Sequence, residues 1–328
     1  MAGPLVALAG GPRAPHPLHD AGRLWPETSC YTDLWIELLA ALGHPPEAAL
    51  GFTAALAYEG DQFTFLKPPL ADLEALFGLR VVELALFEGI EPHLVAQLAR
   101  GRIVLLEVDA FHLPDTRATT WHREHAKTTI AVTALDRERG RLAYVHNAGW
   151  FEVEGEDADG LLRRGPAQAG RLDLLPPYAE LVERRPPPDP AALPRLARER
   201  LAAHLASLPA EDPLEAWRAD LADQMDRLLA GPLEAFHRWA FNLPRQLGAA
   251  FELLASHLRW LAAAGLASGA GAVEPCLEVA REARLLQLQL ARAVHRRRPL
   301  DAGPFLDRMQ RSRAAALSAL RPRPRPSP

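Results

Sequence analysis

The feature that most constrains the fold is a proline-rich stretch near the middle of the chain, Arg184 to Pro190 (RRPPPDP). Consecutive prolines lack backbone N–H donors and have a fixed φ, so the stretch is incompatible with the interior of a helix or a sheet. We interpret residues 184–190 as a linker between a domain at 21–183 and a domain at 191–320. A length of 328 residues suits two domains of ordinary size.

The part before the linker mixes helix and strand patterns. Apolar residues at helical spacing run from Leu34 to Leu42 and end at Gly43, a common residue after a helix C-terminus. Three short runs rich in β-branched and aromatic residues follow, at 102–108, 128–135 and 141–146, and the segment DRERG at 136–140 suits a hairpin turn between the last two. This half is predicted to be α+β.

The part after the linker carries apolar residues at spacings of three and four, without a convincing strand pattern. Four helices are predicted, at 193–208, 213–229, 247–266 and 274–294. Residues 1–20 are rich in Gly, Pro and Ala, and residues 321–328 alternate Arg and Pro, so both tails are expected to be disordered. The second domain is therefore expected to be all-α.

Composition excludes several classes of protein. The formal charge of −4 and pI near 6.3 give no overall basic character for binding nucleic acid or an anionic membrane. The longest apolar stretches are shorter than the roughly 20 residues that span a bilayer, and the N-terminus lacks the basic region of a secretory signal. Two cysteines, Cys30 and Cys276, are too few for a disulfide framework, so a cytoplasmic location is expected.

Cys30 is the candidate nucleophile. It begins the predicted helix that runs to Leu42, and the positive end of a helix dipole favours thiolate. The alternative is a small buried hydrophobic residue, which is common for a lone cysteine. Cys276 follows Pro275 at another predicted helix start and offers an internal comparison for the dipole effect.

His125 and Asn147 could complete a triad with Cys30. His125 lies just before the predicted strand at 128–135, and Asn147 follows the returning strand, so a hairpin brings both to the same end of the sheet. An amide there could orient the imidazole, and Cys, His, Asn is the order in papain-like enzymes. The alternatives are a surface histidine and a turn-forming asparagine.

Several segments together resemble a known family. They are Ser29-Cys30-Tyr31 through Gly43, the run RIVLLEVDAFHLP at 102–114, His125 before a strand, and YVHN at 144–147. Across residues 25 to 180 the chain resembles a bacterial family catalogued as a domain of unknown function. That family is similar to the N-terminal domain of the butirosin-biosynthesis acyltransferase and, more remotely, to the papain-like leader peptidases of bacteriocin exporters.

The resemblance implies a papain-like fold with Cys30 as nucleophile and His125 as base. It further implies acyl or aminoacyl transfer from the phosphopantetheine thioester of a carrier protein to an amine, through an acyl-cysteine. The chain itself would need no cofactor, because the phosphopantetheine belongs to the carrier protein. Those relatives usually have Asp as third member of the triad, whereas this chain has Asn147, as papain itself does.

Two carboxylates are candidate substrate-binding residues. Asp109 directly follows the predicted strand at 102–108. It could line the site or bind an amine acceptor, or it could cap the loop before Pro114. Glu27 stands three residues before Cys30, near where papain-like enzymes keep an oxyanion-hole glutamine. A charged carboxylate would oppose an oxyanion, so the backbone amide of Cys30 is the favoured donor.

Three other readings remain. With water as acceptor, the same residues describe a peptidase or amidase. A zinc or iron site could use imidazoles and Asp109, but the histidines lack the i, i+4 spacing of a metallopeptidase motif, so no metal is expected; they are His112, His122, His125 and His146. In a non-catalytic reading, an arginine-rich helix docks an acidic carrier protein, or is simply a solvated face; its arginines are Arg281, Arg284, Arg292, Arg296, Arg297 and Arg298.

Overall fold

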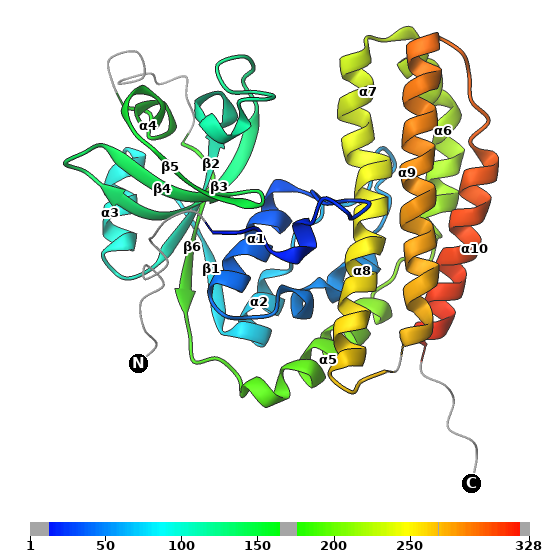
Figure 1. Cartoon of the computed structure of the whole chain (residues 1–328), viewed down its shortest axis with the longest axis horizontal. Coiled ribbons are helices and arrows are strands. Elements are labelled where there is room, and N and C mark those ends of the chain that lie inside the picture. Colours follow the sequence, from blue (N-terminus) through cyan, green and yellow to red (C-terminus); the bar gives the residue numbers. More distant parts are fainter. Residues whose placement is uncertain (1–12, 165–175, 268, 322–328) are drawn as a thin grey trace. The chain divides into compact units, whose positions relative to one another are not determined.

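The computed structural model describes residues 13–164, 176–267 and 269–321, and it contains two compact units that interleave along the chain. The first, here called the sheet unit, comprises Met1–Asp20, Cys30–Pro46 and Pro69–Pro190. The second, the helical unit, comprises Ala21–Ser29, Glu47–Pro68 and Ala191–Pro328. Figure 1 shows the strands of the sheet unit and the helices of the helical unit, coloured along the sequence.

The sheet unit is built on one antiparallel sheet of six strands in the order β1-β6-β2-β3-β4-β5. The strands are β1 (Leu79–Leu84), β2 (Ile103–Asp109), β3 (Lys127–Asp136), β4 (Arg141–His146), β5 (Gly149–Val153) and β6 (Ala179–Arg184). Four helices accompany them: α1 (Cys30–Ala41), α2 (Leu70–Phe77), α3 (Ile90–Leu98) and α4 (Gly155–Leu161). Helices α1 and α2 lie on one face of the sheet, and α3 and α4 lie on the other (Figure 1).

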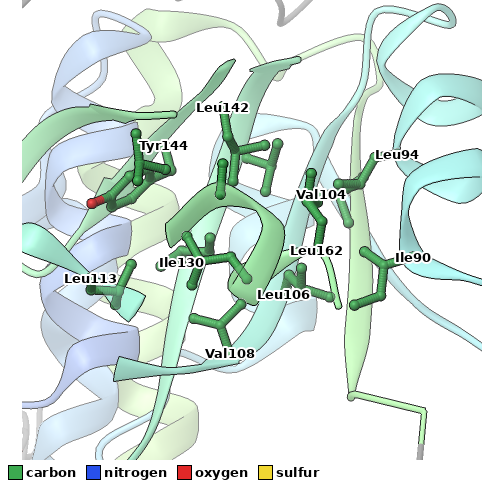
Figure 2. Packing of buried hydrophobic residues seen from close by; sticks show 14 of the residues in the cluster. Ile90, Leu94, Val104, Leu106, Val108, Leu113, Ile130, Leu142, Tyr144 and Leu162 are labelled. Atoms are coloured by element: carbon green, nitrogen blue, oxygen red, sulfur yellow. The ribbon is translucent and has the colours of Figure 1, made fainter. Parts of the chain in front are cut away.

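The hydrophobic core of this unit fills the face covered by α3 and α4. Successive strand residues alternate between faces, so Leu106 and its neighbours two residues away point the same way. Leu106 is paired with Ile130 on the adjacent strand, and both are essentially inaccessible to solvent (Figure 2). Each such side chain contributes roughly 1.5–3 kcal/mol through burial, so this face holds the strands in register.

Helix α1 packs on the opposite face, against β3 and β4. The strand positions beneath it include small residues such as Ala131, which is fully buried, and these allow the helix to approach the sheet closely. Every residue of α1 from Tyr31 to Leu39 is buried. The helix therefore has no solvated side along those residues, and its first residue, Cys30, stands at the edge of the packed region.

The helical unit consists of α5 to α10 with an additional contribution from the first part of the chain. The helices are α5 (Leu193–Ala206), α6 (Pro213–Ala230), α7 (Leu233–Ala240), α8 (Gln246–Ala263), α9 (Val273–Arg296) and α10 (Gly303–Leu320). Helix α9 packs against both α8 and α10. A π-helical turn at Phe241–Arg245, which contains Pro244, joins α7 to α8.

An α+β chain with a helical second part is confirmed, but the units divide the chain differently from the sequence prediction. Residues 21–29 and 47–68, which the prediction assigned to the first domain, belong to the helical unit. Trp25 is one reason: its backbone N–H donates to Glu252 Oε2 at 2.8 Å, and its indole Nε1 donates to the Ala280 carbonyl at 3.1 Å. A proline-rich linker marks where the chain is extended, but it does not reveal where an earlier segment packs.

The expectation of a disordered N-terminal tail fails for the residues that the structure describes. Leu18 is buried, the backbone N–H of His16 donates to Glu37 Oε1 at 2.8 Å, and the Arg13 guanidinium lies 4.7 Å from the centre of the Trp150 ring. One buried leucine and one backbone hydrogen bond leave no periodic pattern in the sequence, so this packing could not be predicted from it. Residues 1–12 and 322–328, the rest of the two predicted tails, lie outside the described residues.

No helix in residues 13–164, 176–267 and 269–321 combines the length and the apolar character required to cross a bilayer.

Candidate active site

The central feature of the site is an imidazole–carboxylate pair at one end of the sheet. His125 Nδ1 lies 2.5 Å from Asp109 Oδ2. Asp109 ends β2 and pairs with Lys127 at the start of β3, so the antiparallel register brings the two ends of the connecting loop together. The His125 ring also stacks on Phe111, with centroids 4.5 Å apart and an interplanar angle of 15°.

Backbone donors fix the carboxylate of Asp109. Its Oδ1 accepts from the N–H of Phe111 at 3.0 Å and from the N–H of Ala126 at 3.3 Å. Partial burial raises the pKa of Asp109, but the hydrogen bonds from His125 and from the backbone more than offset this, so the pKa lies below its usual value. The group is therefore a carboxylate at neutral pH and accepts the Nδ1–H of His125.

With Nδ1 committed to Asp109, the Nε2 atom of His125 is the one left for chemistry. The side chain is 74% exposed. It lines an open pocket of about 520 Å³ together with Glu107, Lys127, Arg163 and Tyr178. Lys127 Nζ pairs with Glu107 at 2.6 Å, so charges of both signs surround the imidazole.

A buried carboxylate connects the pocket to the start of α1. Glu180 on β6 is inaccessible to solvent, and its two oxygens accept from Tyr178 at 2.6 Å and from Tyr31 at 2.5 Å. Burial and the neighbouring carboxylate raise the pKa of Tyr31 far above its usual range, and Tyr178 is shifted in the same direction, so both hydroxyls remain protonated donors. Tyr178 lines the pocket, and Tyr31 directly follows Cys30.

Cys30 is a free thiol of intermediate exposure at the first residue of α1. It follows that the predicted helix start is correct. Within the described part of the chain, the thiol of Cys30 has no hydrogen-bonding partner. Cys276, the intended comparison, is fully buried, and burial raises the pKa of its thiol to about 12. Its low reactivity would therefore report burial rather than a helix dipole.

Asn147 occupies the tight turn between β4 and β5 with a φ of 46°. Asparagine is one of the few non-glycine residues that tolerates this left-handed conformation. The predicted hairpin places it at the same end of the sheet as His125, since Ala131 pairs with Val145 in the antiparallel register. The group that accepts the hydrogen bond from His125 Nδ1 is nevertheless Asp109, which the sequence analysis had placed among the substrate-binding residues.

Glu27 belongs to the helical unit, whereas Cys30 belongs to the sheet unit. Its side chain is 66% exposed and lies 3.5 Å from Arg245 Nη2, which belongs to the same unit. Arg245 also donates to the carbonyl of Thr28 at 3.2 Å. These contacts give Glu27 a role in holding residues 27 and 28 on the helical bundle.

A second imidazole–carboxylate pair, which also includes a hydroxyl, lies on the opposite face of the sheet. His146 Nδ1 is 2.6 Å from Asp115 Oδ2, and its Nε2 is 2.8 Å from Thr128 Oγ1. Tyr144 OH donates to the other oxygen of Asp115 at 2.6 Å. All four residues are largely buried, so this network joins the loop after β2 to strands β3 and β4. The sequence analysis considered His146 only as a metal ligand. Because His146 and Tyr144 are two residues apart on one strand, they share a face of the sheet, and this spacing could have indicated that both contact one partner.

The remaining histidines of the loop bind a third carboxylate. Asp157 on α4 accepts from Trp121 Nε1 at 2.9 Å, lies 2.8 Å from His122 Nε2, and lies 3.7 Å from His112 Nδ1. The four candidate metal-binding imidazoles are thus distributed among three carboxylates. In the described residues, no group of three His, Cys, Asp or Glu side chains is arranged to hold a metal ion.

Chemically, the Asp109–His125 pair is equipped for general-base catalysis. A carboxylate that accepts Nδ1–H fixes the tautomer with a basic Nε2 and stabilises the imidazolium that forms on proton uptake. The pocket beside the pair is open to solvent and is lined by charged side chains, which suits a polar substrate. The pair supplies a base, and catalysis by covalent transfer also requires a nucleophile.

Comparison with protein families identifies the chain. A model described as the DUF1839 N-terminal domain matches residues 14–184, and a model described as the DUF1839 C-terminal domain matches residues 190–322. The chain belongs to the DUF1839 family. The junction between the two matches falls within the proline-rich stretch at 184–190. No curated protein matches the chain.

Proposed function

We propose that this chain is a cysteine-dependent acyltransferase with a papain-like sheet unit. It would move an acyl or aminoacyl group from the phosphopantetheine thioester of a carrier protein to an amine. Cys30 is the nucleophile, His125 is the base, and Asp109 orients the imidazole. The chain would act in the cytoplasm and would require no cofactor of its own.

The reaction has two balanced halves. His125 Nε2 takes the thiol proton of Cys30, the sulfur forms a bond to the thioester carbonyl carbon, and the phosphopantetheine thiolate leaves with the proton from His125. An amine then attacks the acyl-cysteine and gives a proton to His125. The thiolate of Cys30 departs and recovers a proton from the imidazolium, so the enzyme returns to its starting state.

The observation that carries the proposal is the hydrogen bond between His125 and Asp109 beside an open pocket. A surface histidine without catalytic use would not need a carboxylate held by two backbone amides, although such a carboxylate also caps the turn at Phe111. The position of Cys30 at a helix N-terminus, one residue before a tyrosine hydrogen-bonded to Glu180, supports its role as nucleophile.

The donor class rests on the resemblance to the butirosin acyltransferase domain. Water in place of the amine would make the same residues a peptidase or amidase. A non-catalytic carrier-binding module is the third candidate; the pairing of His125 with Asp109 favours catalysis over it, because binding alone does not need an oriented base.

The test is intact-mass spectrometry after incubation with a panel of acyl and aminoacyl phosphopantetheine thioesters. The wild-type chain should gain the mass of one acyl group, which peptide digestion should map to Cys30. Addition of amines should remove the adduct and release the amide. Cys30→Ser is the matched control, since it keeps a small hydroxyl side chain at the helix start.

If an acyl group accumulates equally on the wild-type chain and on Cys30→Ser, the assignment of Cys30 as the nucleophile is refuted. Rapid loss of the adduct in water alone, with hydrolysis of peptide or amide substrates, would instead establish the hydrolase. A Cys30 that reacts with iodoacetamide no faster in the wild type than in His125→Ala, together with no acylation, would favour the binding module.

A further inference from the structure

Helix α9 presents a continuous exposed stripe, which we call the α9 stripe. Two leucines lie at its centre: Leu285 is 47% exposed and Leu288 is 46% exposed. Residues separated by three, four or seven positions share one side of a helix. The α9 stripe therefore comprises Glu274, Glu278, Arg281, Leu285, Leu288, Arg292 and Arg296.

The two ends of the α9 stripe have opposite charge. At the N-terminal end, Arg281 pairs with Glu274 at 2.6 Å and with Glu278 at 2.7 Å, so two carboxylates share one guanidinium. At the C-terminal end, Arg292 and Arg296 are exposed and have no ion-pair partner in the described residues. The stripe is thus acidic, then apolar, then basic along the helix.

The charges are symmetric about Leu285. Glu278 and Arg292 each lie seven residues from it, and Glu274 and Arg296 each lie eleven residues from it. A second α9 running antiparallel, with a two-fold axis at Leu285, would place Glu278 of each copy beside Arg292 of the other. Glu274 would meet Arg296 in the same way, and the leucines would be covered. A parallel arrangement would oppose like charges.

We propose that the α9 stripe is the self-complementary interface of a homodimer with its two-fold axis at Leu285. Such an interface uses the same patch on both subunits, as closed two-fold dimers do. One face of one helix is a small interface, so the dimer should dissociate on dilution. An acidic protein partner fits less well, because it would meet Glu274 and Glu278 at one end of the stripe.

The primary test is sedimentation velocity on the full chain from about 1 to 200 µM at low salt. The wild-type chain should shift reversibly from its monomer mass of 35.9 kDa towards twice that value. Glu278→Arg and Arg292→Glu should each weaken dimerisation at least tenfold, because each creates two like-charge contacts. An equimolar mixture of the two variants should dimerise, since both contacts in the mixed dimer again join opposite charges.

The recovery by mixing also controls for folding, because a misfolded variant could not recover by mixing. A wild-type chain that stays monomeric throughout this range would overturn the proposal, whether or not it binds an acidic protein or anionic vesicles. A dimer that is unchanged by Leu285→Glu and by both charge reversals would overturn it equally, because the contact would then lie elsewhere.

A crosslink locates the axis. In a Cys30→Ser background, Leu285→Cys should form an intermolecular disulfide under mild oxidation, because the axis brings the two positions together. Gln289→Cys is the matched control: it lies one turn further along α9 and would face Arg281 of the other copy. Equal crosslinking at both positions would contradict an axis at Leu285.

Discussion

At the scale of single residues, exposure separates three similar imidazole–carboxylate contacts. His125 with Asp109, His146 with Asp115 and His122 with Asp157 are all within 2.8 Å. His146 is 2% exposed and both of its ring nitrogens have partners, so it can only brace the strands. His125 is 74% exposed, and its second nitrogen faces a pocket. His122 is 50% exposed, but of the three imidazoles it is His125 that lines the open pocket, which is why we propose His125 as the base.

The contact between Asp109 and His125 predicts how the third member of the triad behaves. Asp109→Asn should slow acylation of Cys30 by about 100-fold or more, because a neutral amide stabilises the imidazolium less than a carboxylate does and can favour the wrong tautomer. Asn147→Ala should change the rate by less than about threefold. The measurement is single-turnover acylation with a thioester that labels the wild-type chain.

The reverse ranking, with Asn147→Ala the slower variant, would restore the triad predicted from the sequence. Circular dichroism on both variants controls for folding, since Asp109 also caps the turn at Phe111 and Asn147 also occupies a left-handed turn. His125→Ala sets the rate expected when the base is lost entirely.

The sequence singled out the candidate residues but not the contact between His125 and Asp109. Cys30, His125 and Asp109 stand out by type and by position at the ends of predicted elements. The partner of His125 depends on the loop at 110–126, whose ends are joined by the hydrogen bond from Ala110 N to the Ala126 carbonyl at 2.8 Å. A loop of this length has no periodic pattern, so the contact could not be read from spacing.

At the scale of elements, strong local patterns predicted structure and long-range pairing did not. Helix α1 and the β3–β4 hairpin were predicted because periodicity and turn residues lie within one short segment. Strands β1, β5 and β6 were missed. Strand β6 lies between β1 and β2 in the sheet, so its register depends on segments far away in sequence. Residues 21–29 were misassigned for the same reason, because Trp25 packs on helices that begin more than 200 residues later.

The packing of Trp25 predicts that a glycine-to-alanine substitution within a helix lowers stability, which is the opposite of its usual effect. Alanine normally stabilises a helix interior by about 1 kcal/mol relative to glycine. A Cβ at Gly248 in α8 would lie 2.4 Å from the Trp25 ring, which would have to move. Gly248→Ala should therefore destabilise the helical unit by about 1–3 kcal/mol, as overpacking of a core does. Thermal and denaturant unfolding measure the change.

Gly271→Ala is the matched control, because its added Cβ would meet only Ala319 Cβ at an ordinary 3.8 Å. It should be close to neutral. A Gly248→Ala chain that is as stable as the wild type would mean that Trp25 does not rest on α8 in solution. Indole fluorescence and hydrogen exchange of residues 21–29 would then locate the segment.

At the scale of the whole molecule, the two units treat a buried histidine differently. In the sheet unit both ring nitrogens of His146 have partners, the Asp115 carboxylate and the Thr128 hydroxyl. The helical unit buries His257 differently. Its Nδ1–H donates to the carbonyl of Glu47 at 2.7 Å, while Nε2 lies against Gly51 and has no hydrogen-bonding partner in the described residues. A proton on that nitrogen would be buried without an acceptor.

The helical unit should consequently lose stability in mild acid. Burial lowers the pKa of His257 from 6.5 to about 4. Between these values the unfolded chain binds a proton that the folded chain does not, so stability falls as pH drops through 6.5 and levels off near pH 4. A difference of this size corresponds to about 3 kcal/mol. His257→Asn keeps a donor for the Glu47 carbonyl and removes the titration. Its stability relative to the wild type should rise by that amount between pH 7 and pH 4, whereas parallel curves would show that the imidazole is already solvated in the native state.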